Sequence, residues 1–149
     1  MDAGRVEAIN IGPPEQLPEP VKRVNAHAGK GLVGNRYYFE DGAKPGRALT
    51  LIAAEALEAM AAEGGPAVAP ADARRNVVTR SVDLDALVGR RFLLGEVECV
   101  GRRWCEPCAH LQRLTAPGAL RGLVHRGGLR ADILRSGTVR LGDGVRLAD

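Results

Sequence analysis

The chain has 149 residues, of which 45% are hydrophobic, and a formal charge of +3. This length is enough for one domain with its own core and too short for two ordinary ones, so we expect a single domain over residues 1–149. No run approaches the ~20 apolar residues of a membrane span, and residues 1–11 lack a secretory signal pattern, so we expect a cytoplasmic protein without a membrane partner.

Glycine (19 residues) and proline (9 residues) divide the chain into short segments, which is typical of barrels and other strand-rich domains. We therefore expect a mainly β, barrel-like fold with a few short helices. The range 12–20 holds four prolines and is predicted to be a loop or an extended surface segment. In chain order, strands are predicted at residues 6–11, 33–39, 48–52, 76–79, 91–94, 96–100, 129–134, 138–141 and 145–147.

The last two strands alternate apolar and polar residues across the turn formers Gly142 to Gly144, which predicts a hairpin. A helix is predicted at residues 53–63, because apolar residues recur there at steps of three and four and Gly64, Gly65 and Pro66 follow. Shorter helices are expected after Pro107 and at residues 83–88, where Asp83 would be the cap.

Nearly all basic residues are arginine, since lysine occurs only at positions 22, 30 and 44. Arginine suits bidentate recognition of anions, but a high-GC coding bias would raise arginine, alanine and glycine together. The placement of the arginines therefore carries more information than their number.

The glycines between positions 29 and 34 have the spacing of a dinucleotide-binding fingerprint. The match fails, because residues 35–39 form a strand-like aromatic run where the fingerprint needs a helix. A phosphate-binding P-loop also fails, because Lys30 is followed by Gly31. Two interpretations remain: a structural turn, or a close approach of backbone to a ligand with Arg36 projecting from the strand edge.

Two arginines and an amide, Arg74, Arg75 and Asn76, precede an apolar strand. Alternation along a strand predicts that Arg74 and Asn76 share one face and grip an anion there, while Arg75 takes the other face. A solvated strand start is an equally good alternative.

The pair Cys105 and Cys108 supplies only two of the four ligands of a structural zinc site. Recruitment of His110 and His125 would complete one, but their spacing does not resemble a zinc ribbon or finger, so zinc is a minority interpretation. The strand and long helix of a thioredoxin-like redox site are also missing. Cys99 alternates with Val97 and is interpreted as a buried hydrophobic residue. Three cysteines do not form a disulfide framework, so any function they have is chemical.

A thiol near several guanidinium groups has a pKa below the free value of ~8.5, which makes it a better nucleophile or soft-metal ligand. The segment that holds His125 and Arg126 is a polar, glycine-bearing turn that would line the rim of such a pocket. An ordinary hydrogen-bonded histidine is an equal interpretation of His125.

The order of these segments resembles that of the MOSC domain, a module found at the C-terminus of molybdenum cofactor sulfurases and in small stand-alone bacterial proteins. The resemblance covers almost the whole chain and runs through residues 31–36, 49–52, 74–78, 87–92, 105–108, 125–128 and 137–143. It implies a barrel-like, MOSC-type fold that binds the molybdenum cofactor (molybdopterin), a phosphorylated pterin. The family is also associated with pyridoxal phosphate binding.

The resemblance implies that the Cys108 thiolate is the metal ligand and the catalytic residue. Stand-alone members often read Gly-Asp-Arg-His where this chain has Gly34-Asn35-Arg36-Tyr37, so the anion-binding arginine is kept and an acid and an imidazole are lost. Cys105 is interpreted as an extra buried cysteine, with a resolving thiol as the alternative. The residues implied as contacts of the phosphate, the pterin or the pocket rim are Arg36, Arg74, Asn76, Arg75, Arg80, His125 and Arg126.

Two functions follow from the resemblance. One is a molybdenum-dependent oxidoreductase that reduces N-hydroxylated compounds with an electron-donor protein, because the chain has no flavin, haem or iron–sulfur motif. The other is a sulfur carrier that receives a persulfide on Cys108 from a cysteine desulfurase. Nucleic-acid binding ranks last, since aromatic residues make up only 3% of the chain and the arginines are dispersed.

Overall fold

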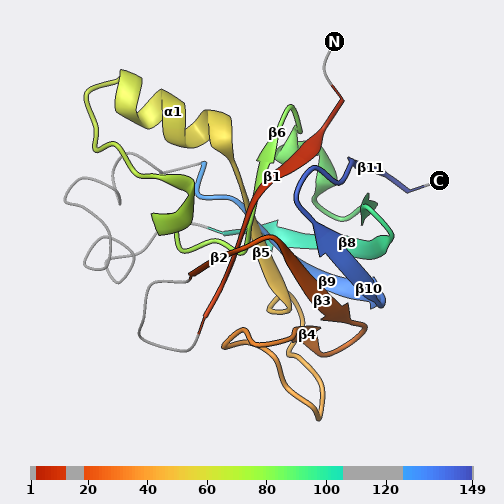
Figure 1. Ribbon diagram of the computed structural model, residues 1–149. Helices are drawn as coiled ribbons and strands as arrows, with labels where there is room; N and C mark the ends of the chain where they lie inside the picture. The colour runs from red at the N-terminus through yellow and green to blue at the C-terminus, as the bar shows by residue number, and fades with distance from the viewer. Residues whose placement is uncertain (1–2, 13–18, 106–125, 149) are drawn as a thin grey trace.

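A computed structural model of the protein describes residues 3–12, 19–105 and 126–148 (Figure 1). Strands dominate it, and the mainly β fold expected from the sequence is confirmed. The helical elements are α1 (Ala54–Ala62) and two single-turn 3-10 helices, η1 (Pro70–Asp72) and η2 (Leu84–Leu87). The strands are β1 (Arg5–Ile11), β2 (Glu19–Val21), β3 (Arg23–His27), β4 (Gly31–Leu32), β5 (Leu49–Ala53), β6 (Val77–Arg80), β7 (Arg91–Leu94), β8 (Val97–Trp104), β9 (Leu129–Arg135), β10 (Gly137–Arg140) and β11 (Val145–Leu147).

The strands form one large and one small sheet. The eight-stranded sheet has the order β11-β7-β8-β9-β5-β6-β1-β2, and the three-stranded sheet has the order β10-β3-β4. Among the strands that the structure describes, only β5 and β6 pair in parallel, and α1 provides the crossover that a parallel pair needs. Figure 1 shows α1 lying outside the strands, at one end of β5.

The large sheet curls so that its two ends approach each other. The Val6 amide donates to the Asp143 carbonyl (2.8 Å), the Gly142 amide donates to the Val6 carbonyl (2.9 Å), and the Val145 amide donates to the Gly4 carbonyl (3.0 Å). These bonds join β1 to the turn that leads into β11. The fold is therefore barrel-like, although β1 and β11 do not share a ladder in the part of the chain that the structure describes.

Two hydrophobic clusters lie on opposite faces of β5. Leu49 and Leu51 belong to the main core inside the curled sheet, while Ile52 belongs to a smaller cluster with Leu57 and Met60 of α1. Successive side chains of a strand point to opposite faces, so Thr50 lies on the same face as Ile52, outside the main core. The part of this face that α1 leaves uncovered carries the candidate site.

Most of the predicted elements are confirmed within one or two residues at their ends. The strands predicted at 91–94 and 145–147 have the bounds of β7 and β11. The helix predicted at 53–63 is α1, and the Asp83 carboxylate accepts a hydrogen bond from the Asp85 amide (3.1 Å) at the start of η2. The helix expected after Pro107 lies outside the described residues.

Two predictions about local structure are wrong. The strands at 138–141 and 145–147 form no hairpin, because β10 pairs with β3 and β11 pairs with β7. Residues 33–39 form turns, in which the Asn35 amide donates to Leu32 and the Tyr38 amide to Asn35. The segment predicted at 12–20 as a loop or an extended surface segment ends in β2, where Pro20 is tolerated because β2 is an edge strand.

Within the described ranges, no helix has both the length and the apolar composition that a membrane span requires.

Candidate functional site

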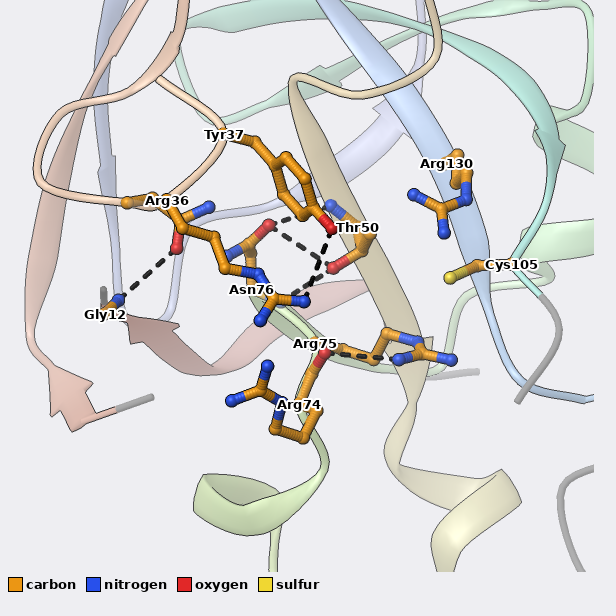
Figure 2. Close-up of a pocket in the computed structure, with 10 residues that line it drawn as sticks. Gly12, Arg36, Tyr37, Thr50, Arg74, Arg75, Asn76, Cys105 and Arg130 are labelled. Carbon is orange, nitrogen blue, oxygen red and sulfur yellow. Dashed lines mark hydrogen bonds between the residues drawn. The ribbon is translucent and has the colours of Figure 1, made fainter. Parts of the chain in front are cut away.

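Four arginines line a pocket on the face of the large sheet that lies beside α1 (Figure 2). Its empty space is about 430 Å³, including the part that opens to solvent. Among the described residues, its lining contains no carboxylate, so the pocket suits an anion. This site, called the arginine pocket below, is lined by Gly12, Asn35, Arg36, Tyr37, Thr50, Arg74, Arg75, Asn76, Cys105 and Arg130.

Asn76 forms the structural floor of the arginine pocket. Its side-chain oxygen accepts hydrogen bonds from the amide (3.0 Å) and the hydroxyl (3.3 Å) of Thr50, and its side-chain nitrogen donates to the carbonyl of Asn10 (3.1 Å). Its own amide donates to the Thr50 hydroxyl (3.0 Å). Asn76 therefore ties β6 to β5 and β1, and its side-chain oxygen is already saturated by protein donors.

Arg74 and Arg75 both face the pocket, so the prediction that Arg75 takes the opposite face is wrong. The alternation rule does not apply to them, because β6 begins only at Val77 and Arg74 has a left-handed backbone conformation (φ 58°). The Arg75 Nε donates to the Gly127 carbonyl (2.8 Å), which holds this side chain against the segment before β9. Both arginines are more than 90% buried: Arg74 is 9% exposed and Arg75 is 7% exposed.

Arg36 comes from a turn and not from a strand edge. Its amide donates to the Gly12 carbonyl (3.0 Å), and the Asn35 side-chain oxygen accepts from the Gly12 amide (3.3 Å). These two bonds dock the turn on the end of β1. The Arg36 guanidinium lies 4.9 Å from the centre of the Tyr37 ring, a cation–π contact that orients it over the pocket. Asn35, one of the two departures from the family motif, thus has a structural role.

Cys105 brings a thiol to the arginine pocket. It is only 2% exposed, and Figure 2 shows its sulfur on the side of the pocket where Arg130 and Arg75 lie. Its amide donates to the Gly128 carbonyl (2.8 Å) at the start of β9. Cys99, by contrast, lies in the main core, where burial raises the pKa of its thiol, as expected for a buried hydrophobic residue.

The predicted site residues separate into three groups. Arg36, Arg74, Arg75 and Asn76 come together in the arginine pocket. Arg80 and Arg126 do not line this pocket, and each forms an ion pair elsewhere. Cys108 and His125 lie outside the described residues.

Arg80 lines a different pocket. Its guanidinium binds the carboxylates of Glu7 (Nε to Oε1, 2.9 Å) and Glu58 (NH2 to Oε2, 2.7 Å). The hydrogen bond from Arg80 is the main reason that the pKa of the Glu58 carboxyl is lowered. This second site, called the apolar pocket below, is lined by Glu7, Ala54, Leu57, Glu58, Ala61, Ala67, Val68, Ala69, Pro70 and Arg80.

Arg126 is paired in a similar way. Its NH2 lies 2.8 Å from Oε1 of Glu63, and this contact lowers the pKa of the Glu63 carboxyl. Arg126 lines a small depression together with Trp104 and Gly128. It does not belong to the lining of the arginine pocket.

Sequence patterns did not identify Thr50, Arg130 or Tyr37 as pocket residues. Thr50 and Arg130 are register partners on the antiparallel strands β5 and β9, so their side chains stand together on one face. Arg130 alternates with the apolar residues Leu129 and Ala131, which indicates that its side chain points away from the core. The sequence did not show which strand lies beside β9.

In the described parts of the chain, no three His, Cys, Asp or Glu side chains are grouped in a way that would hold a metal ion. The described residues of the site therefore contribute cationic and hydrogen-bonding groups and one thiol. This donor set suits an anionic ligand better than a metal held by protein side chains alone.

The model of the MOSC domain family matches residues 27–146, and the chain belongs to this family, which is associated with binding of the molybdenum cofactor. Comparison with curated protein sequences finds no match.

Several solved structures have a similar fold. The YuaD protein from Bacillus subtilis superposes with a TM-score of 0.83 at 16% sequence identity, covering 98% of this chain and 96% of that one. YiiM from Geobacillus stearothermophilus has a TM-score of 0.75 at 15% identity, with 98% and 75% coverage. YiiM from Escherichia coli has a TM-score of 0.71 at 20% identity, with 97% and 70% coverage. At these identities the likeness shows the fold alone.

Proposed function

We propose that the protein binds the molybdenum cofactor, with the phosphate of the pterin in the arginine pocket and the Cys108 thiolate as a ligand of the metal. The observation that carries this proposal is the charge of the pocket: four guanidinium groups line it, with no carboxylate among its described lining residues. Family membership supplies the identity of the cofactor, and the pocket supplies the chemistry that would hold it.

The donor set fits a phosphate group. Guanidinium groups bind phosphate oxygens through paired N–H donors, and such charge-assisted bonds are shorter and stronger than neutral ones. Arg74 and Arg75 are largely buried, so their charges are weakly screened by water and a bound anion would interact with them strongly. Arg36 is less buried and is held by the Tyr37 ring, which suits it to close on the ligand from the solvent side.

The cofactor, when bound, would supply two-electron redox chemistry at molybdenum. The residues of this chain would orient it: Asn76 and Thr50 fix the floor, and the arginines neutralise the phosphate. Tyr37 places a hydroxyl 3.4 Å from the Arg36 NH2 at the pocket, where it is available as a hydrogen-bond partner.

For the overall reaction we propose the reduction of an N-hydroxylated compound. Two electrons from a donor protein and two protons would convert the N–OH group to N–H and release water. The sequence has no motif for a flavin, a haem or an iron–sulfur cluster, so the electrons would come from an external donor.

Cys105 supports an alternative, in which the protein carries sulfur. The Cys108 thiolate would attack the terminal sulfur of a persulfide on a cysteine desulfurase, take that sulfur, and release the desulfurase thiolate. The observation that favours this alternative is a second thiol, Cys105, in the lining of the arginine pocket three positions before Cys108. It would be a resolving thiol for a persulfide.

The test is the cargo of the protein purified from a host that loads other molybdenum enzymes. We expect molybdenum by elemental analysis, together with a fluorescent pterin oxidation product. Cys108→Ala should lose molybdenum, and Arg36→Gln should lower the pterin content about tenfold, because a charged hydrogen bond to the phosphate is removed. Arg80→Gln is the matched control and should retain both.

Equal molybdenum in the wild-type protein and Cys108→Ala would remove Cys108 as the ligand. A wild-type protein without molybdenum or pterin, but with labile sulfur that disappears in Cys108→Ala, would replace the first function with sulfur transfer.

A further inference from the structure

The strand β8 contains a bulge next to the arginine pocket. Gly101 pairs with Ala131 and Arg103 pairs with Arg130, so Arg102 is an extra residue without a partner on β9. Bulges re-aim side chains and are common beside functional sites. Here the bulge brings two consecutive arginines to one face: Arg103 through its pairing with Arg130, and Arg102 through its hydrogen bond to Asp132.

Thr50, Arg130 and Arg103 form a row across three neighbouring strands. Thr50 of β5 pairs with Arg130 of β9, which pairs in turn with Arg103 of β8. Directly paired residues of antiparallel strands have side chains on the same face. Neighbouring strands lie ~4.8 Å apart, so the row extends roughly 10 Å from the floor of the arginine pocket.

The two arginines of the bulge differ in charge compensation. Arg102 binds the Asp132 carboxylate (Nε to Oδ2, 2.8 Å). For Arg103 and Arg130, no carboxylate among the described residues lies within ion-pair distance. Among the described residues, the positive charge of the pocket therefore continues along the row as far as Arg103 with no ion-pair partner for Arg130 or Arg103.

The position of Arg103 is fitted to the loop before β5. A side-chain carbon at Gly46 would lie 2.9 Å from the NH1 of Arg103, so the absence of one leaves room for this guanidinium. The Gly46 amide donates to the Asp132 Oδ1 (2.8 Å), which fixes the loop against β9. Arg103 is thus exposed but placed over a defined surface.

We propose that the arginine pocket is one end of a longer anion site that continues through Arg130 to Arg103, and that its ligand is a form of the pterin cofactor whose phosphate is linked to a second phosphate. One phosphate would lie among Arg36, Arg74 and Arg75 as in the proposed function, on which this inference rests. The second would lie along the row, where Arg130 and Arg103 supply the donors. A ligand with a single phosphate in the pocket leaves Arg103 unused.

The test compares inorganic phosphate with pyrophosphate, by calorimetric titration of the wild-type protein and Arg103→Gln. Glutamine keeps much of the side-chain length and removes the charge. We expect Arg103→Gln to weaken pyrophosphate binding about tenfold and to leave phosphate binding unchanged, because only the second phosphate reaches position 103. Arg103→Lys should restore part of the pyrophosphate affinity.

The matched control is Arg146→Gln, which removes an exposed arginine from β11, three strands away from β9 in the sheet order. An equal loss of pyrophosphate affinity in Arg146→Gln and Arg103→Gln would overturn the inference in favour of general charge attraction. Equal losses for both ligands in Arg103→Gln would also overturn it. Failure of the wild-type protein to bind either anion would instead contradict the phosphate role of the pocket itself.

Discussion

The arginine pocket and the apolar pocket both contain arginine, yet they differ in the charge that they offer to a ligand. Arg80 of the apolar pocket lies between the carboxylates of Glu7 and Glu58. The arginine pocket has four guanidinium groups and no carboxylate in its described lining. The apolar pocket has more empty space, about 660 Å³ against about 430 Å³.

The difference shows that an arginine predicts an anion site only where its charge is not already neutralised by the protein. Residues of the same chain segment, 67–80, line both pockets, so nearness in the sequence does not explain the difference between them. The apolar pocket pairs its single cation with two carboxylates at its rim, and the remaining lining is alanine, leucine, valine and proline. In the arginine pocket, by contrast, the hydrogen-bonded floor is made of the neutral side chains of Asn76 and Thr50, and no described lining residue is a carboxylate.

The largest expected effect comes from breaking that floor with Asn76→Ala. The change leaves the Thr50 amide and the Asn10 carbonyl without their side-chain partner, at a cost of about 1–3 kcal/mol for each buried group. We expect the free energy of unfolding to fall by about 3 kcal/mol in total and phosphate binding to be lost, as measured by urea denaturation and calorimetric titration.

Asn25→Ala is the matched control for that experiment, because the Asn25 side-chain oxygen accepts only an exposed hydrogen bond from Thr138 (3.0 Å). It should change stability by less than about 0.5 kcal/mol and leave binding intact. Normal phosphate affinity in a folded Asn76→Ala protein would show that the floor does not position the arginines.

A smaller, opposite effect is expected from freeing the cation of the apolar pocket. In the double variant Glu7→Gln, Glu58→Gln, Arg80 loses both carboxylate partners. We expect a second, weak phosphate site to appear, detected as an increase in phosphate bound per chain in equilibrium dialysis. Glu19→Gln, which removes an exposed carboxylate from β2, should leave the stoichiometry at the wild-type value. An unchanged stoichiometry in the double variant would mean that shape, and not charge compensation, separates the two pockets.

The smallest expected effect is the pH dependence of the Arg80–Glu58 contact. The pKa of Glu58 is lowered in the folded state, so the contact stabilises the protein above the unfolded value of about 4.3 and this contribution is lost as the pH falls through the folded pKa. Arg80→Gln should therefore be less stable than the wild type at pH 7, by a small amount because the pair is exposed, and this difference should shrink as the pH falls below about 4. A difference in urea midpoints that stays constant between these pH values would contradict an electrostatic origin.

The sequence was sufficient for elements whose residues carry a local pattern. β7 and β11 were predicted with their bounds, because β7 is a short apolar run between Gly89 and Gly95 and the apolar residues of β11 alternate with a polar one after Gly144. α1 was predicted from its three- and four-residue apolar spacing. The candidate arginines 36, 74 and 75 were also found from sequence, since they stand in recognisable motifs beside turns.

Pairing between distant segments was decided only by the tertiary structure. The predicted hairpin at the C-terminal end failed, because the turn between β10 and β11 bonds to β1 and sends the two strands to different sheets. Thr50 and Arg130 lie together in the site because of the register between β5 and β9. Arg80, predicted as a site residue, binds Glu7 and Glu58 in the other pocket.

The sequence by itself thus determined most of the strands, the helix α1 and the motifs that carry positive charge, but it missed β3 and β4 and predicted a strand where residues 33–39 form turns. The tertiary structure decided which of these charges are available to a ligand. The physical reason is that backbone conformation responds to neighbours a few positions away along the chain. Charge compensation depends instead on carboxylates that strand pairing brings within about 4 Å of the cation. Arg80 and its partner Glu7, for example, are 73 positions apart in the sequence.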